Sequence, residues 1–158
     1  MTATSPDRNA VRLRRTIAAP AARVYRAWLD PEVLRHWLAP GSLSVARAEV
    51  EERPGGRFSI WQVDATGDAG GFECELLELV PDERIIFSWR FVGPLRVADP
   101  AHDSRLTITL SEVADGTELT LVHERLDPLR AAMPHVAENV SVGWELALDN
   151  LARTLRGP

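Results

Sequence analysis

The sequence predicts an α+β fold in which a seven-stranded antiparallel sheet wraps around a long C-terminal helix, with two short helices between the first two strands. Two observations lead to this prediction. From Ser44 to Glu124 apolar and polar side chains alternate, which is typical of strands with one buried face. From Asn139 to Leu155 apolar side chains recur at steps of three and four, so that they share one face of a helix. These two apolar faces favour packing against each other.

The N-terminal quarter of the chain is expected to supply the first strand and the two short helices. Residues 1–9 are polar and predict a disordered tail, so that residues 10–158 form a single domain. The apolar pattern of Ala21–Leu29 predicts one helix. Asp30-Pro31 predicts the N-cap and first turn of a second helix, which should end at Pro40-Gly41.

Six further strands are expected, each an alternating run bounded by glycine, proline or aspartate. The Asp115-Gly116 pair is the clearest hairpin signal. Because most of the turns are short, we expect neighbouring strands to run antiparallel. The predicted strands are Ser44–Glu52, Arg57–Val63, Gly71–Leu79, Arg84–Val92, Arg105–Glu112 and Glu118–Glu124.

The C-terminal helix carries Gly143 beside Trp144 in its interior. Glycine costs about 1 kcal/mol relative to alanine in a helix, so Gly143 suggests that another element approaches the helix closely there. A strongly curved sheet is not filled completely by one helix. The remaining gap is the natural place for a small-molecule cavity.

Composition argues against several classes of protein. The 158 residues include 18 basic and 23 acidic side chains, a net charge of −5, which argues against nucleic acid as a partner. The single cysteine, Cys74, excludes an intramolecular disulfide and fits a reducing compartment. No apolar run reaches the length of a membrane span, and the N-terminus lacks the core of a signal peptide. We therefore expect a cytoplasmic protein with neither a membrane nor a nucleic-acid partner.

Several stretches of the chain are similar to one known family. They are TIAAPAARVYRAWLDPEVLRHWLAP at residues 16–40, PGGRF at 54–58, GFECELLELVPDERIIFSWRF at 71–91, RLTITLSEVADGTELTLVHERL at 105–126 and GWELALDNLARTL at 143–155. In this order they resemble the activator of Hsp90 ATPase homologue 1-like family of the START/Bet v 1-like superfamily, and the compact length resembles its bacterial members. The resemblance implies the helix-grip fold and an inner cavity, but it does not imply an activity.

His123 is the first candidate for chemistry. By strand parity it shares the phase of Leu119 and Leu121, so it should point into the cavity. There it could anchor a polar group of a ligand or act as a general base. Alternatively, it is a strand-end histidine bonded to a neighbour. The spacing of the histidines and carboxylates suggests no metal site, and we expect no cofactor.

Side chains in phase with the buried faces are the expected ligand contacts. Trp89 shares the phase of neighbouring phenylalanines, and Trp144 should face the sheet from the helix. Cys74 is expected to be a small buried hydrophobe rather than a nucleophile, because a nucleophile needs a lowered pKa and a partner base. The predicted ligand-binding residues are Trp89, Phe87, Ile108, Leu121, His123, Trp144, Leu148 and Cys74.

Trp61 leaves two alternatives open. It is out of phase with Phe58 and Ile60. Either it lies on the outer face of the sheet, or a bulge at Ser59 shifts the register. An outer tryptophan would suit a partner surface such as a homodimer contact.

These patterns predict a protein that binds a small apolar or amphipathic ligand between the sheet and the C-terminal helix, because the sequence shows no catalytic constellation. Two alternatives stay open. An enzyme of the same fold, such as a cyclase, dehydratase or hydrolase, would use His123 with a carboxylate or tyrosine within hydrogen-bond reach. A protein-interaction module, as in the co-chaperone branch of the family, would need an exposed apolar or charged patch.

Overall fold

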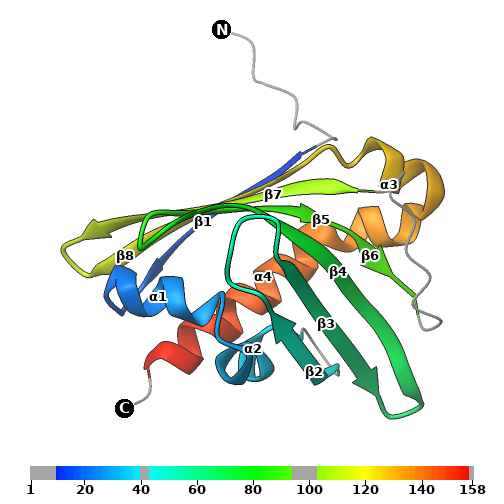
Figure 1. The fold of residues 1–158 in the computed structure, drawn as a ribbon, viewed down its shortest axis with the longest axis horizontal. Coiled ribbons are helices and arrows are strands. Elements are labelled where there is room, and N and C mark those ends of the chain that lie inside the picture. The colour runs from blue at the N-terminus through cyan, green and yellow to red at the C-terminus, as the bar shows by residue number, and fades with distance from the viewer. Residues whose placement is uncertain (1–9, 40–42, 94–102, 157–158) are drawn as a thin grey trace, which may run out of the picture.

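The structure, a computed structural model, describes residues 10–39, 43–93 and 103–156. The predicted α+β helix-grip class is confirmed, since one antiparallel sheet packs against the long helix α4 (Figure 1). The predicted tail over residues 1–9 and the helix end at Pro40-Gly41 lie outside the described residues. The elements are β1 (Ala10–Ile17), α1 (Ala21–Ala27), α2 (Pro31–Trp37), β2 (Ser44–Val50), β3 (Arg57–Asp64), β4 (Gly67–Val80), β5 (Arg84–Trp89), β6 (Phe91–Val92), β7 (Ser104–Val113), β8 (Gly116–Glu124), α3 (Asp127–Ala132) and α4 (Pro134–Arg156).

The sheet contains one strand more than predicted. Its order is β1-β8-β7-β5-β4-β3-β2, and the short strand β6 pairs with β4 beside this path. The predicted strand Arg84–Val92 is interrupted at Arg90, so it becomes β5 and β6. Up to Ser88 the chain pairs with both β4 and β7, whereas β6 pairs with β4 alone among the described residues. β6 therefore continues the sheet along β4.

The C-terminal helix begins earlier than predicted. α4 starts at Pro134 rather than Asn139, and the unpredicted helix α3 precedes it. Proline stands in the first turn of each, where its missing N–H leaves no donor unpaired. Polar side chains dominate the exposed faces of this part of α4, which is why the apolar periodicity alone placed the start too late. α4 crosses the sheet from α3 to the C-terminus (Figure 1).

The helices α1 and α2 pack beside the C-terminal half of α4 (Figure 1). The predicted cap of α2 is confirmed, because Asp30 Oδ1 accepts a hydrogen bond from Glu32 N at 3.0 Å. The indole of Trp37 donates to the Ala27 carbonyl oxygen at 2.9 Å. Its ring lies edge-on to Trp28, with centroids 4.6 Å apart. These two tryptophans fill the space between the short helices and the sheet.

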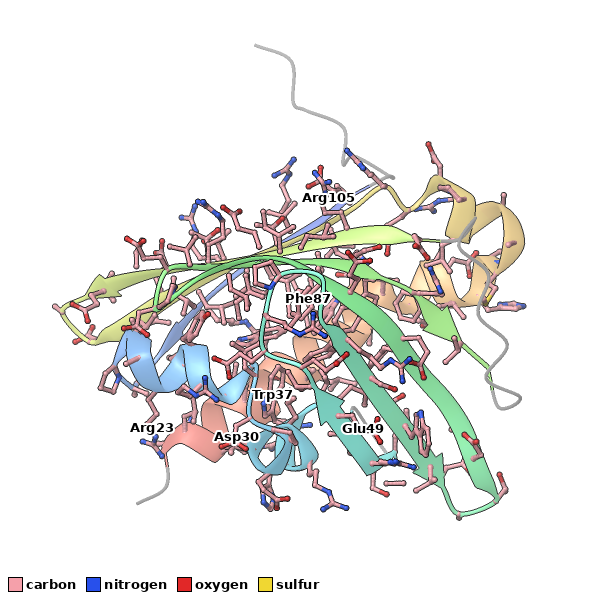
Figure 2. All side chains as sticks on the ribbon, viewed as in Figure 1. Arg23, Asp30, Trp37, Glu49, Phe87 and Arg105 are labelled. Atoms are coloured by element: carbon pink, nitrogen blue, oxygen red, sulfur yellow. The ribbon has the colours of Figure 1, made fainter. Side chains whose placement is uncertain are left out.

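The middle of the sheet is closely packed on the side that faces α4. Figure 2 shows Phe87 on this side and Arg105 on the opposite side of the strands. The ring of Phe87 contacts Phe58 at 5.0 Å and Trp89 at 5.4 Å between centroids. Trp89 in turn lies 5.3 Å from Trp144 of α4. The aromatic core therefore joins the sheet to the long helix.

Trp61 lies on the outer face of the sheet. The register between β3 and β4 is continuous from Arg57 to Gln62, so no bulge at Ser59 shifts it. Trp61 Nε1 donates to Glu73 Oε1 at 3.3 Å, and the guanidinium of Arg47 lies 4.4 Å over the indole. A homodimer contact through this face stays a prediction.

Candidate functional site

An apolar hollow of about 620 Å³ opens between the N-terminal half of α4 and the end of the sheet where β4 and β6 meet. We call it the α4 groove. None of the described residues that line it is aspartate, glutamate, lysine or arginine. Its polar lining residues are Gln62, His135 and Asn139. The apolar walls include Phe72, Phe91, Met133, Val136, Val140 and Trp144.

Glycine allows β4 and β6 to come together at one wall of the groove. Gly70 has a φ of +97°, which favours glycine, and a Cβ there would lie 2.2 Å from the Val92 carbonyl oxygen. Gly71, the next residue, pairs with Val92 and lines the groove. The close approach of the two backbones holds Phe72 and Phe91 side by side, with ring centroids 5.4 Å apart. These two rings form the sheet side of the groove.

Gly143 forms an open part of the opposite wall. A Cβ built at Gly143 would meet no atom within 4 Å, and the residue lines the groove. The prediction that another element packs closely against Gly143 is therefore wrong. Asn139 and Ala147, one helical turn away on either side, line the same hollow. The missing side chain widens the groove along α4.

Of the predicted ligand contacts, Trp144 lines the groove. The others lie in the packed core behind it. Phe87, Trp89, Ile108, Leu121, His123 and Leu148 are each 0% exposed, and Cys74 is 7% exposed. Strand parity selected the correct face of the sheet, but it contains no information on which part of that face the helices cover. A ligand contact by these core residues stays a prediction.

The hydrogen bonds of His123 define its tautomer. Trp144 Nε1, which can only donate, lies 3.0 Å from His123 Nδ1, so Nδ1 accepts and Nε2 carries the proton. Nε2 therefore donates to Ser104 Oγ at 2.7 Å. The Ser104 hydroxyl donates to the Trp89 carbonyl oxygen at 2.9 Å. Burial lowers the pKa of His123 to about 3, which keeps the ring neutral.

This arrangement does not suit His123 as a general base. Its protonated Nε2 faces Ser104, so it cannot take the serine proton. The enzyme hypothesis required a carboxylate or tyrosine within hydrogen-bond reach of His123. Within the described chain, the two side chains that form hydrogen bonds with His123 are Trp144 and Ser104. His123 instead holds the indole of Trp144 in place at the groove wall.

Neither the cysteine nor a metal cluster adds a reactive centre to the described part of the chain. Burial raises the pKa of the Cys74 thiol, so the reactive thiolate is disfavoured. Residues 10–39, 43–93 and 103–156 contain no group of three or more histidine, cysteine, aspartate or glutamate side chains that could hold a metal ion. No helix in these ranges is long and apolar enough to cross a membrane.

A second hollow, of about 520 Å³, lies on the outer face of the sheet and is polar. Glu73, Glu75, Arg90 and Asp103 are among its lining residues. Arg90 binds both carboxylate oxygens of Asp103, at 2.6 and 2.9 Å. This ion pair occupies part of the polar hollow, and we regard the apolar α4 groove as the better candidate site for a small apolar molecule.

Comparison with known proteins agrees with the fold. Residues 18–156 match the family described as Activator of Hsp90 ATPase homolog 1-like protein. The chain belongs to this family. The resemblance predicted from the sequence is therefore confirmed. No curated protein matches the chain.

Solved structures with the same fold include bacterial proteins. Protein CV1439 from Chromobacterium violaceum is 36% identical with a TM-score of 0.77, over 95% of this chain and 99% of that one. Protein NE0264 from Nitrosomonas europaea is 26% identical with a TM-score of 0.77, over 94% and 95% of the two chains. CalU16 from Micromonospora echinospora is 27% identical with a TM-score of 0.66, over 92% and 75%. At a coarse level, membership of the activator of Hsp90 ATPase homologue 1-like family supports a ligand-binding or co-chaperone-like module.

Several groove residues of this family member were not predicted from the sequence. Gln62 is in phase with Phe58 and Ile60, so its inward direction could have been read from β3. Phe72 and Phe91 also had inward phases. What could not be read was that the strand breaks at Arg90 and that β6 pairs with β4, because strand pairing depends on segments distant in the sequence.

Proposed function

We propose that this protein binds a small apolar or amphipathic molecule in the α4 groove. The observation that carries the proposal is a hollow of about 620 Å³ whose lining is mostly apolar and contains no aspartate, glutamate, lysine or arginine among the described residues. Small-molecule pockets typically measure about 300–1,000 Å³ and combine apolar walls with a few polar groups. A ligand here would remove the exposed parts of these walls from water.

The structure of the groove wall supports a preformed site. Trp144 is 5% exposed and its indole is held by His123, so it needs no reorganisation before a ligand arrives. Phe91 stacks on the His123 ring, with centroids 5.9 Å apart and planes at 14°. The two aromatic walls are thus supported by the same buried histidine.

Substitution of Gly143 tests the proposal directly. We expect Gly143→Phe to fill the groove, because the new side chain enters open space. The measurement is fluorescence titration with N-phenyl-1-naphthylamine, a neutral apolar probe, supported by native mass spectrometry of the purified protein for bound molecules. Probe binding should fall at least about tenfold, which corresponds to about 1.4 kcal/mol. Glu145→Phe is the matched control, since Glu145 is an exposed residue of α4 outside the groove lining. Equal binding by wild type and Gly143→Phe, or no binding by wild type, would contradict the proposal.

One observation favours a second candidate, a protein-interaction module. Val142 and Leu146 lie one turn apart on α4 and are 52% and 43% exposed. Both border the α4 groove, so an apolar segment of a partner could cover them together with the groove. Val142→Ser combined with Leu146→Ser distinguishes the candidates. This double variant should strongly weaken the binding of a protein partner, but it should reduce probe binding less than Gly143→Phe does.

A further inference from the structure

Gln62 is a buried polar side chain in the wall of the α4 groove. It is 5% exposed and extends from β3 on the same side as Phe58 and Ile60. Its Nε2 donates to the Leu38 carbonyl oxygen at 3.0 Å. Because a carbonyl oxygen can only accept, this bond defines which end of the amide is nitrogen. The amide oxygen, Oε1, is therefore the other end.

The Oε1 atom of Gln62 is available to a ligand. No described residue donates a hydrogen bond to it. Oε1 is absent from the fully buried side-chain atoms that lack a partner, so it reaches accessible space. Gln62 lines the groove. Oε1 is therefore presented to the hollow as an unused acceptor. A ligand that covers Oε1 removes it from water, and an acceptor covered without a donor is unfavourable, so this position favours a molecule that donates a hydrogen bond.

Two other polar groups of the groove agree with this chemistry, whereas the imidazole of His135 can both donate and accept and does not discriminate. Asn139 Nδ2 donates to the His135 carbonyl oxygen at 2.7 Å, which leaves the amide oxygen of Asn139 as its free end. Trp144 donates its indole N–H to His123 rather than to the groove. The lining contains no arginine or lysine among the described residues, so an anion would lose its hydration without a permanently charged cation in return.

We infer that the α4 groove selects a neutral, mostly apolar ligand that carries a hydroxyl or N–H donor, which hydrogen-bonds to Gln62 Oε1. The inference rests on the proposed function of the same groove and adds the chemical class of the ligand. A carboxylate in this position would place its oxygen against another acceptor. An ether of the same shape would leave Oε1 without a donor.

Three matched compounds test the ligand class: 2-naphthol, 2-methoxynaphthalene and 2-naphthoate, titrated into the full-length protein at pH 7 by calorimetry. They share the bicyclic ring and differ in the group offered to Gln62, as a neutral donor, a neutral acceptor and an anion. We expect 2-naphthol to bind about five- to tenfold more tightly than 2-methoxynaphthalene, the size expected for one net hydrogen bond. The naphthoate should bind most weakly.

Substitution of Gln62 tests the residue. Gln62→Met keeps a similar length and removes the acceptor, so the ratio between 2-naphthol and 2-methoxynaphthalene should fall to about one. Ser59→Ala is the control on the same strand, because Ser59 donates to Glu73 at 2.9 Å on the outer face. This control should preserve the wild-type ratio.

The outcomes separate the two proposals. If none of the three compounds binds wild type, the proposed function of the groove fails and the inference fails with it. If 2-naphthol and 2-methoxynaphthalene bind wild type equally, or if the naphthoate binds best, the groove remains a binding site and the inference is overturned. If the Gln62→Met variant fails to fold, the cause is the lost hydrogen bond to the Leu38 carbonyl oxygen. The comparison of compounds in wild type would then decide the question without the variant.

Discussion

His123 is a neutral hydrogen-bonded link between the sheet and α4. It accepts from Trp144 on the helix and donates to Ser104 on β7, so one side chain of β8 joins three elements. Aromatic rings surround it, with Phe91 stacked and Trp89 edge-on at 6.2 Å. Protonation of Nδ1 would replace an accepted hydrogen bond with two donors facing each other. The folded state therefore requires the neutral ring.

This requirement predicts a specific response to acid. The pKa of His123 is about 3 in the folded chain, against an ordinary value of 6.5. Between these pH values the unfolded chain binds one more proton, so the free energy of unfolding rises with pH by about 1.4 kcal/mol per unit. The contribution of the neutral His123 to the free energy of unfolding is complete above about pH 6.5 and is lost as the pH falls towards 3.

His123→Phe should remove that pH dependence. At pH 7 we expect the variant to be about 1–3 kcal/mol less stable, because Trp144 loses its acceptor. Its stability should then fall less steeply than that of wild type as the pH is lowered. Urea unfolding at several pH values measures both quantities. Parallel pH curves for the two proteins would contradict the neutral, buried assignment.

The inward direction of His123 could be predicted from the sequence, but its chemistry could not. Alternation along β8 shows which face His123 shares with Leu121. Its partners Ser104 and Trp144 belong to distant segments, and the tautomer depends on their donors. Sequence reasoning therefore left both a general base and a bonded histidine open at this position.

At the scale of the elements, α4 combines a packed half with an open half. Its C-terminal half is held by β1, where Arg15 pairs with Asp149, and by the α1–α2 region, where Asn150 Nδ2 donates to the Ala39 carbonyl oxygen at 3.5 Å. Its N-terminal half borders the α4 groove. Gly143 lies on this open half, where close packing does not compensate for the low helix propensity of glycine.

Gly143→Ala should therefore stabilise the protein. Alanine is favoured over glycine in a helix interior by about 1 kcal/mol, and its methyl group would meet no atom within 4 Å at this position. Denaturant unfolding should show a higher midpoint with an unchanged slope. If Gly143→Ala were destabilising, the open-space assignment of Gly143 would be wrong.

The cap of α2 allows a similar prediction at the other end of the chain. Asp30 Oδ1 binds Glu32 N, and Asp30→Ala removes this acceptor from the first turn. We expect a loss of about 1 kcal/mol in the free energy of unfolding. Asp30→Ser is the control, because serine caps helices nearly as well. An equal loss in Asp30→Ser would show that the capping bond is not the cause.

The beginning of α2 could be predicted and the beginning of α4 could not, for a physical reason. Asp30-Pro31 combines a cap with a proline in the first turn, and both act locally. The first residues of α4 pack against α3 and line the groove, so their helical state depends on tertiary contacts rather than on a strong periodic pattern.

For the whole molecule, alternation and turn signals were sufficient to predict a sheet around a helix. They could not locate the groove. Its position depends on which part of the sheet is covered by α1, α2 and the C-terminal half of α4, and on the pairing of β6 with β4. These are long-range relations among elements. The aromatic cluster consequently divides into a packed part around Phe87 and an open part around Phe91.

This division predicts opposite effects of two similar substitutions. Phe87 is 0% exposed between Phe58 and Trp28, so Phe87→Ala should cost about 3–5 kcal/mol of stability. Phe91 is half-buried and lines the groove, so Phe91→Ala should cost less stability but weaken binding of N-phenyl-1-naphthylamine more. Urea unfolding and probe titration on the same preparations measure the two effects. If Phe87→Ala weakened binding more than Phe91→Ala while still folded, the ligand would reach the packed part of the cluster. The contacts predicted from the sequence would then describe the site better than the α4 groove does.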